Sequence, residues 1–277
     1  MPYATRNDAE IYYETRGHGA PLLLLEGLGY GLWMWRGQSP ALEDRFRLVL
    51  VDNRGVGKST PLTGPYSMPE FARDALAVLD AEGIERTAVL GPSMGGFIAQ
   101  SLAATAPERV SALVLACTSP GGPTSLPIPP ATLTEMMRVV PNESSADRLR
   151  RTMALALTPE YPREHAVEFE KVIADRLASP TDATQWMYQA LSPREFDARE
   201  SDAHLAARTL ITTGTEDRVV PFANSFALYR TIPNASLALF HGQGHLHLLE
   251  RASEYNALVA EFLLAPPETP PFVRELG

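Results

Sequence analysis

The stretch that decides the fold is Gly91-Pro92-Ser93-Met94-Gly95-Gly96, a G-x-S-x-G pattern. It follows the short apolar run of residues 87–90 and precedes a helix-like run over residues 97–104. A strand, this pattern and a helix in succession are typical of a nucleophile elbow, in which a sharp turn exposes a serine hydroxyl at the start of a helix. Glycines at positions 91 and 95 remove the Cβ atoms that would collide across such a turn. The stretch therefore predicts a serine nucleophile, Ser93, beside the N-terminus of a helix.

Outward from this stretch, short apolar runs alternate with runs of helical spacing. Alternation of this kind predicts a mostly parallel sheet with helices on both faces, which is the α/β fold class. The expected strands are residues 10–15, 21–25, 46–51, 87–90, 110–116, 208–213 and 235–240, and the expected helices include residues 33–42, 69–82, 97–104 and 252–264.

The alternation is interrupted after the strand that ends at Ala116. Several helical segments then follow without a strand between them, which predicts a helical cap inserted into the α/β core. We expect a first core part over residues 1–118, the cap over residues 119–204 and a second core part over residues 205–265. Residues 266–277 form a proline-rich C-terminal tail, which we expect to be extended or loose.

Composition limits the classes of function. The chain has 277 residues and a net charge of −9 without a dense basic run, which argues against a nucleic-acid partner. A single cysteine, Cys117, rules out an internal disulfide and favours a reducing compartment. No apolar run has the length of a membrane span, and the N-terminus lacks the apolar core of a signal peptide. We expect a cytoplasmic protein without a membrane partner.

A serine hydroxyl is a weak nucleophile until a base removes its proton, so Ser93 requires a histidine. Of the six histidines, only His245 lies in a glycine-spaced loop directly after a core strand. A carboxylate must orient that histidine, and Asp217 lies just past the preceding strand; its neighbour Glu216 is the alternative acid. Because the carboxyl ends of parallel strands meet at one edge, Ser93, Asp217 and His245 are predicted to converge there as a catalytic triad. His241, His245 and His247 alternate along the same loop but have no matching carboxylates, so we predict no metal site.

These motifs, together with Asp52-Asn53-Arg54-Gly55-x-Gly57 and Gly242-x-Gly244-His245, resemble those of α/β hydrolases of the esterase and lactonase type over nearly the whole chain. The chain is similar to the 3-oxoadipate enol-lactone hydrolase and carboxylesterase branches. The resemblance implies the α/β-hydrolase fold, an oxyanion hole made by the backbone N–H groups of Leu28 and Met94, and no cofactor. It implies cleavage of a small to medium carboxylic ester or lactone.

One residue departs from the family pattern, because Glu26 stands where relatives usually carry a histidine before the oxyanion residue. An ionised, unpaired carboxylate there would oppose the developing negative charge. One interpretation is a buried or paired glutamate, held by Arg54 from the neighbouring loop. The other is that Glu26 selects substrates by hydrogen bonding a polar group.

Further candidates for the substrate pocket are Trp33, Met137, Trp186 and His247, and ordinary packing is the alternative for each. The same triad also serves C–C bond hydrolases, acyltransferases and perhydrolases. In a different class, the fold is compatible with a ligand receptor that turns over slowly.

Overall fold

A nine-stranded sheet forms the centre of the protein, whose computed structural model describes residues 2–277. The strand order is β1-β2-β4-β3-β5-β6-β7-β8-β9. The pairs β1/β2 and β2/β4 are antiparallel, and every other pair is parallel. The predicted fold class is confirmed. The strands are β1 (Tyr3–Arg6), β2 (Ala9–Arg16), β3 (Ala20–Leu25), β4 (Phe46–Val51), β5 (Thr87–Pro92), β6 (Val110–Ala116), β7 (Arg208–Gly214), β8 (Ala235–Phe240) and β9 (Val273–Leu276).

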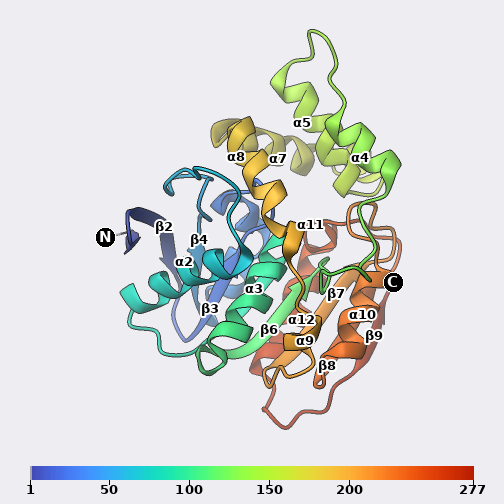
Figure 1. Ribbon diagram of the computed structural model, residues 1–277. Coiled ribbons are helices and arrows are strands. Elements are labelled where there is room, and N and C mark those ends of the chain that lie inside the picture. The colour runs from blue at the N-terminus through green and yellow to red at the C-terminus, as the bar shows by residue number, and fades with distance from the viewer. Residues whose placement is uncertain (1) are drawn as a thin grey trace.

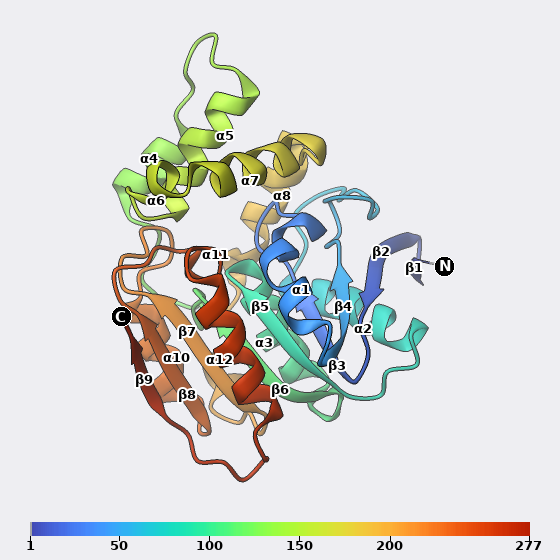
Figure 2. The same ribbon diagram turned by 180° about the vertical axis from the view of Figure 1, so that it is seen from behind.

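Helices cover both faces of this sheet (Figures 1 and 2). One face carries α2 (Met68–Ala81), α3 (Met94–Thr105) and α10 (Ala223–Thr231), and the other carries α1 (Ser39–Leu42) and α12 (Ala252–Leu264). Successive side chains of a strand point to opposite faces. Accordingly, Leu23 of β3 packs in the first core and its neighbour Leu24 in the second. The apolar strands predicted from the sequence are therefore buried on both sides. Shorter elements are η1 (Leu32–Gly37), η2 (Pro107–Arg109) and α11 (His247–Glu250).

The segment between β6 and β7 is helical and stands over the carboxyl end of the sheet as a cap (Figure 1). An isolated bridge between Gly121 and Asp197 closes the base of this segment. The boundaries at residues 119 and 204 stay predictions. Its elements are α4 (Pro130–Met137), α5 (Ser145–Met153), η3 (Ala154–Ala156), α6 (Tyr161–Glu164), α7 (Ala166–Ala178), α8 (Ala183–Leu191), η4 (Ser192–Glu195) and α9 (Arg199–Asp202).

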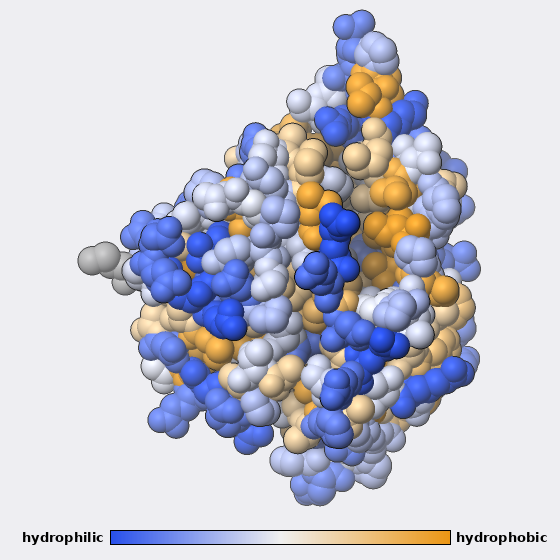
Figure 3. All heavy atoms as spheres, viewed as in Figure 1, coloured by the Kyte–Doolittle hydropathy of each residue, from blue (hydrophilic) through white to orange (hydrophobic). Residues whose placement is uncertain are grey.

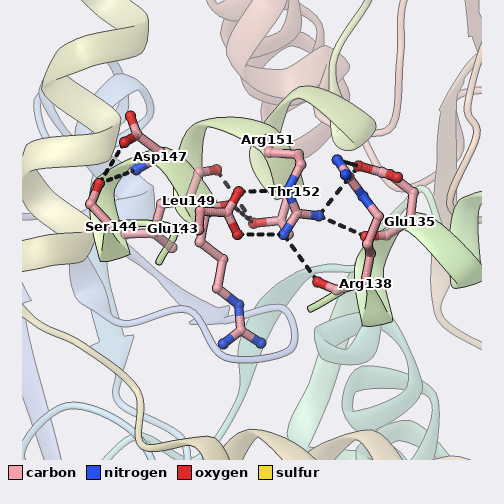
Figure 4. Close-up of polar contacts among 9 residues, drawn as sticks. Glu135, Arg138, Glu143, Ser144, Asp147, Leu149, Arg151 and Thr152 are labelled. Carbon is pink, nitrogen blue, oxygen red and sulfur yellow. Dashed lines mark hydrogen bonds and ion pairs between the residues drawn. The ribbon is translucent and has the colours of Figure 1, made fainter. Parts of the chain in front are cut away.

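Arg151 ties the outer part of the cap together (Figure 4). Its guanidinium donates two hydrogen bonds of 2.8 Å to the carboxylate of Glu143. It also donates to the backbone carbonyls of Glu135 at 2.8 Å and Arg138 at 3.1 Å. One side chain thereby joins the end of α4, the following loop and α5.

Three features of the fold differ from the predictions. The sequence analysis missed strands β1 and β9, because four-residue edge strands carry a weak sequence pattern. Strand β9 pairs in parallel with β8, so the end of the C-terminal tail is an ordered strand. The helix expected over residues 33–42 is divided into η1 and α1, since Gly37 and Pro40 both disfavour an α-helix interior.

The longest helix in the part of the chain that the structure describes, α2, has 14 residues, and no helix there is long and apolar enough to cross a bilayer.

Candidate active site

Ser93 occupies a strained turn between β5 and α3. Its backbone has φ 52° and ψ −119°, a conformation that L-residues rarely adopt. A Cβ on Gly91 would lie 2.2 Å from the carbonyl oxygen of Gly95, and a Cβ on Gly95 would lie 2.2 Å from the carbonyl oxygen of Leu25. Both positions therefore require glycine. The Ser93 N–H donates to the carbonyl oxygen of Ala116 at 2.9 Å, which fixes the turn against β6.

Asp217 and His245 form a buried hydrogen-bonded pair. The Nδ1 atom of His245 lies 2.8 Å from Oδ2 of Asp217. The other carboxylate oxygen of Asp217 accepts the backbone N–H groups of Val219 at 2.7 Å and Val220 at 2.8 Å. With Nδ1 held in this way, Nε2 is the ring nitrogen left for proton transfer.

The loops that carry these two residues are pressed together at the carboxyl edge of the sheet. Asp217 follows β7 and His245 follows β8, and a Cβ on Gly214 would lie 2.2 Å from the carbonyl oxygen of Gly244. Ser93 follows the parallel strand β5, so the three predicted groups leave the sheet at one edge. Within residues 2–277 the hydrogen-bonded relay reaches from Asp217 to His245, and no bond joins His245 to the Ser93 hydroxyl. Catalytic hydrogen bonds often tighten only when substrate binds.

The surroundings of His245 favour its protonated form. Burial by itself lowers the pKa of the imidazole, but the Asp217 carboxylate more than offsets that effect, and the pKa is raised well above 6.5. Asp217 is thus placed to stabilise an imidazolium, which is the state that follows removal of a proton from a nucleophile.

The loop after β3 lies against the serine turn. A Cβ on Gly27 would be 3.8 Å from Cβ of Ser93. Met94 is the first residue of α3, and the leading N–H groups of a helix have no acceptor within it. The backbone hydrogen bonds of residues 2–277 outside regular elements do not use the Leu28 N–H either. Both predicted oxyanion donors therefore belong to segments that flank Ser93, and their role stays a prediction.

Glu26 is fully buried, and its carboxyl oxygens have no hydrogen-bond partner among residues 2–277. The expectation that Arg54 holds it was wrong, because the Arg54 guanidinium bonds to both oxygens of Asp74 at 2.8 and 2.9 Å. Burial, together with the nearby Asp52 carboxylate, raises the pKa of Glu26 well above 4.5. The neutral acid does not oppose an oxyanion in the way that an ionised carboxylate would.

The remaining pocket candidates have different surroundings. Trp33 is half-buried and packs 5.1 Å from the ring of Tyr30, and Met137 is exposed on α4. Trp186 lies over Gly29, where a Cβ would be 2.6 Å from the indole Cδ1. These three stay candidates.

The prediction that His247 lines the pocket was wrong, because its side chain has no exposed surface. Its ring packs between Phe240 and Tyr255, and Nε2 lies 2.9 Å from Oγ1 of Thr212. Burial lowers the pKa of His247 to about 4, so the ring is a neutral core group.

Cap residues that the sequence analysis missed hold the loops of the site. Gln189 and Thr181 bond to the backbone of Gly29, next to Leu28. The carboxylate of Glu250 accepts the N–H of Gly244, directly before His245, at 2.6 Å, and also the Thr158 hydroxyl of the cap at 2.8 Å. No local pattern could have shown contacts between residues so far apart along the chain.

In the described part of the chain, no three His, Cys, Asp or Glu side chains are grouped so that they could hold a metal ion.

Comparisons with known proteins agree with this architecture. Residues 20–252 match the family model described as the alpha/beta hydrolase fold. The chain is 33% identical over 264 residues, 95% of its own length and 98% of the relative's, to RutD of Azorhizobium caulinodans, provisionally named a carbamate hydrolase. It is 32% identical, with 92% of both chains covered, to a 2-hydroxy-6-oxononadienedioate/2-hydroxy-6-oxononatrienedioate hydrolase of Pseudomonas putida.

A solved structure also resembles the chain. The enol-lactonase from Burkholderia xenovorans LB400 has a TM-score of 0.82 at 25% identity and covers 95% of this chain and 100% of its own. The resemblance to the esterase and lactonase type is confirmed, and the chain belongs to the alpha/beta hydrolase family.

Proposed function

We propose that the protein is a serine hydrolase that cleaves a small to medium carboxylic ester or lactone through an acyl-enzyme on Ser93. The observation that carries the proposal is the strained serine at φ 52° at the sheet edge where Asp217 holds His245 at 2.8 Å. A strained backbone at a nucleophile position, maintained by two obligatory glycines, is typical of a functional site.

In this proposal, Ser93 Oγ attacks the carbonyl carbon while His245 Nε2 takes its proton. The N–H groups of Leu28 and Met94 donate to the tetrahedral oxyanion. The intermediate collapses, and the leaving alkoxide receives the proton from His245. A water molecule, deprotonated by His245, then attacks the acyl carbon; collapse of the second intermediate releases the acid and returns the proton to Ser93.

Apolar surface on the cap supports a substrate with an apolar part. Figure 3 shows orange surface on the cap in the region of α4. Large apolar side chains there are well exposed, including Met137 at 57% on α4 and Met187 at 53% on α8. Exposed apolar groups of this extent on a monomer often mark a ligand or interaction surface.

The relatives favour a second candidate activity. The Pseudomonas putida relative is named for a 2-hydroxy-6-oxo dienedioate, and the same three catalytic groups can cleave a C–C bond next to a ketone if the departing carbon is protonated. The Azorhizobium relative adds a carbamate, whose carbonyl is open to the same attack.

The test is a hydrolysis panel of p-nitrophenyl esters of increasing acyl length, lactones, carbamates and a vinylogous diketone. Product analysis identifies which bond is cleaved. Ser93→Ala is expected to abolish turnover and fluorophosphonate labelling, whereas the exposed Ser111→Ala on β6 is the matched control and is expected to retain both. Turnover by Ser93→Ala would refute the proposal. Stoichiometric labelling without turnover of any substrate would instead favour a ligand receptor.

A further inference from the structure

Three side chains of the cap hold one glycine of the core. Gly29 has φ +68° and donates its N–H to Oε1 of Gln189 at 2.9 Å. Its carbonyl oxygen accepts the hydroxyl of Thr181 at 3.0 Å. The indole of Trp186 covers its Cα, since a Cβ there would be 2.6 Å from the ring. Both peptide groups that flank Gly29 are thus bound by residues about 150 positions further along the chain.

Gln189 connects this glycine to a second core loop. Its side chain is fully buried, and its amide Nε2 donates to the carbonyl oxygen of Arg54 at 2.9 Å. Arg54 is itself fixed by the two hydrogen bonds of its guanidinium to Asp74. The amide therefore spans the loops that follow β3 and β4, which are adjacent strands.

We propose that Gln189 is a positioning residue that sets the direction of the Leu28 N–H in the oxyanion hole, an inference that rests on the function proposed above. The Gly29 N–H belongs to the peptide group directly after Leu28, so the bond to Gln189 restricts the rotation of Leu28 ψ. Glycine reaches both signs of φ, and an unheld Gly29 would let the loop rotate away. The cap therefore completes the oxyanion hole without touching the reacting atoms.

The chain contains a matched control one helical turn earlier. Gln185, also on α8, makes the same kind of two-sided bridge, in which Oε1 accepts the N–H of Leu62 at 2.6 Å and Nε2 donates to the carbonyl oxygen of Leu62 at 3.1 Å. Leu62 lies in a loop that carries none of the proposed catalytic groups. Loss of Gln185 loosens α8 by two hydrogen bonds, as loss of Gln189 does, but leaves Gly29 bound.

The experiment compares Gln189→Met with Gln185→Met in the full chain. The first readout is the second-order rate constant for labelling of Ser93 by a fluorophosphonate, a reaction that places a phosphoryl oxygen in the oxyanion hole and requires no knowledge of the substrate. We expect Gln189→Met to react roughly 10- to 100-fold more slowly, up to the range seen for loss of a hole donor. Gln185→Met is expected to react like wild type.

The second readout uses a p-nitrophenyl ester that the wild type cleaves. For Gln189→Met, kcat is expected to fall with KM nearly unchanged, and the affinity for a trifluoromethyl ketone is expected to fall in parallel, because the ketone adduct carries an oxyanion. Gln189→Glu keeps the acceptor for the Gly29 N–H and is expected to recover part of the loss.

Labelling of Gln189→Met at the wild-type rate, or equal losses in Gln189→Met and Gln185→Met, would overturn the inference. If Gln189→Met does not fold, Gln189→Leu, which also removes the acceptor for the Gly29 N–H, takes its place in both comparisons. Absence of labelling in the wild type would instead reject Ser93 as the nucleophile, so the two failures are distinct.

Discussion

Asp202 supplies a test of the electrostatics of the fold, because it is a buried acid without a partner. It ends α9 at the junction of cap and core, has no exposed surface, and neither of its carboxylate oxygens has a hydrogen-bond partner among residues 2–277. Burial, with the nearby Asp197 carboxylate, raises the pKa of Asp202 from 3.8 to about 7. The folded protein therefore holds a proton that the unfolded chain releases.

The sign and size of the effect follow from that difference. Between pH 3.8 and about 7 the folded state binds one more proton than the unfolded state, so stability falls as pH rises, by about 1.4 kcal/mol per pH unit. The whole interval corresponds to about 4 kcal/mol, and more than half of this change falls between pH 5 and 7. Below the interval both states are protonated, and above it both are ionised. Asp202→Asn cannot ionise and loses this dependence.

The assay is urea unfolding followed by tryptophan fluorescence at half-unit steps from pH 5 to 8. The free energy of unfolding of Asp202→Asn minus that of wild type is expected to climb by roughly 2–3 kcal/mol and to level off above about pH 7. A constant offset from the amide group does not affect this shape. Asp44→Asn, at an exposed position, removes the same formal charge and is the control for the change in net charge. A flat difference for Asp202→Asn would refute the reasoning.

Three further predictions concern the site and the cap. Because His245 must be neutral to accept a proton and its pKa is raised, the acid limb of the kcat/KM profile is expected above pH 6.5. Asp217→Asn removes the charge that raises the pKa of His245, so the limb is expected to move to lower pH and the rate to fall by roughly 10⁴-fold. A limb that does not move would contradict the pairing of Asp217 with His245. Glu26→Gln is expected to gain stability relative to wild type as pH rises above 4.5 in urea unfolding, because the folded protein keeps the acid protonated while the unfolded chain ionises it, and the gain ends once the folded protein also ionises it. A pH-independent difference would argue against a buried neutral glutamate. Arg151→Met breaks the hydrogen bonds to Glu143 and to the end of α4, so amide hydrogen exchange is expected to accelerate over residues 135–153 but not in β5 and β6. Equal protection in the variant and the wild type would show that these bonds do not stabilise the outer part of the cap.

Local patterns were sufficient to predict most of the core. The strand, turn and helix around Ser93 could be predicted because each is set by neighbouring residues, with the glycines at 91 and 95 as the steric requirement. Asp217 and His245 could be assigned to the same edge because parallel strands β7 and β8 end there. These inferences needed only the direction of the strands.

Contacts between distant segments could not be predicted in this way. Gln189 lies 160 residues from Gly29, and nothing in the sequence around either residue indicates the bond. The role of Glu26 depended on whether Arg54 was available, and Asp74 on α2 takes that guanidinium. His247 lies two residues after His245, and the sequence alone left both a pocket role and core packing open. The turn into α11 directs its ring into the core.

The hydrogen bonds that attach the cap to the core affect how such enzymes can diversify in sequence. Gln189, Gln185 and Thr181 engage N–H and carbonyl groups of Gly29, Arg54 and Leu62, which are atoms that every non-proline residue possesses. Substitutions in the recipient loops can therefore accumulate without breaking the attachment where the backbone path is kept, except at Gly29, where Trp186 leaves no room for a Cβ. A chimera that transplants this cap onto a homologous scaffold should therefore keep these donor amides and hydroxyls, together with the bonds of Glu250 to Thr158 and of Arg218 to the carbonyl oxygens of Ala154 and Leu157.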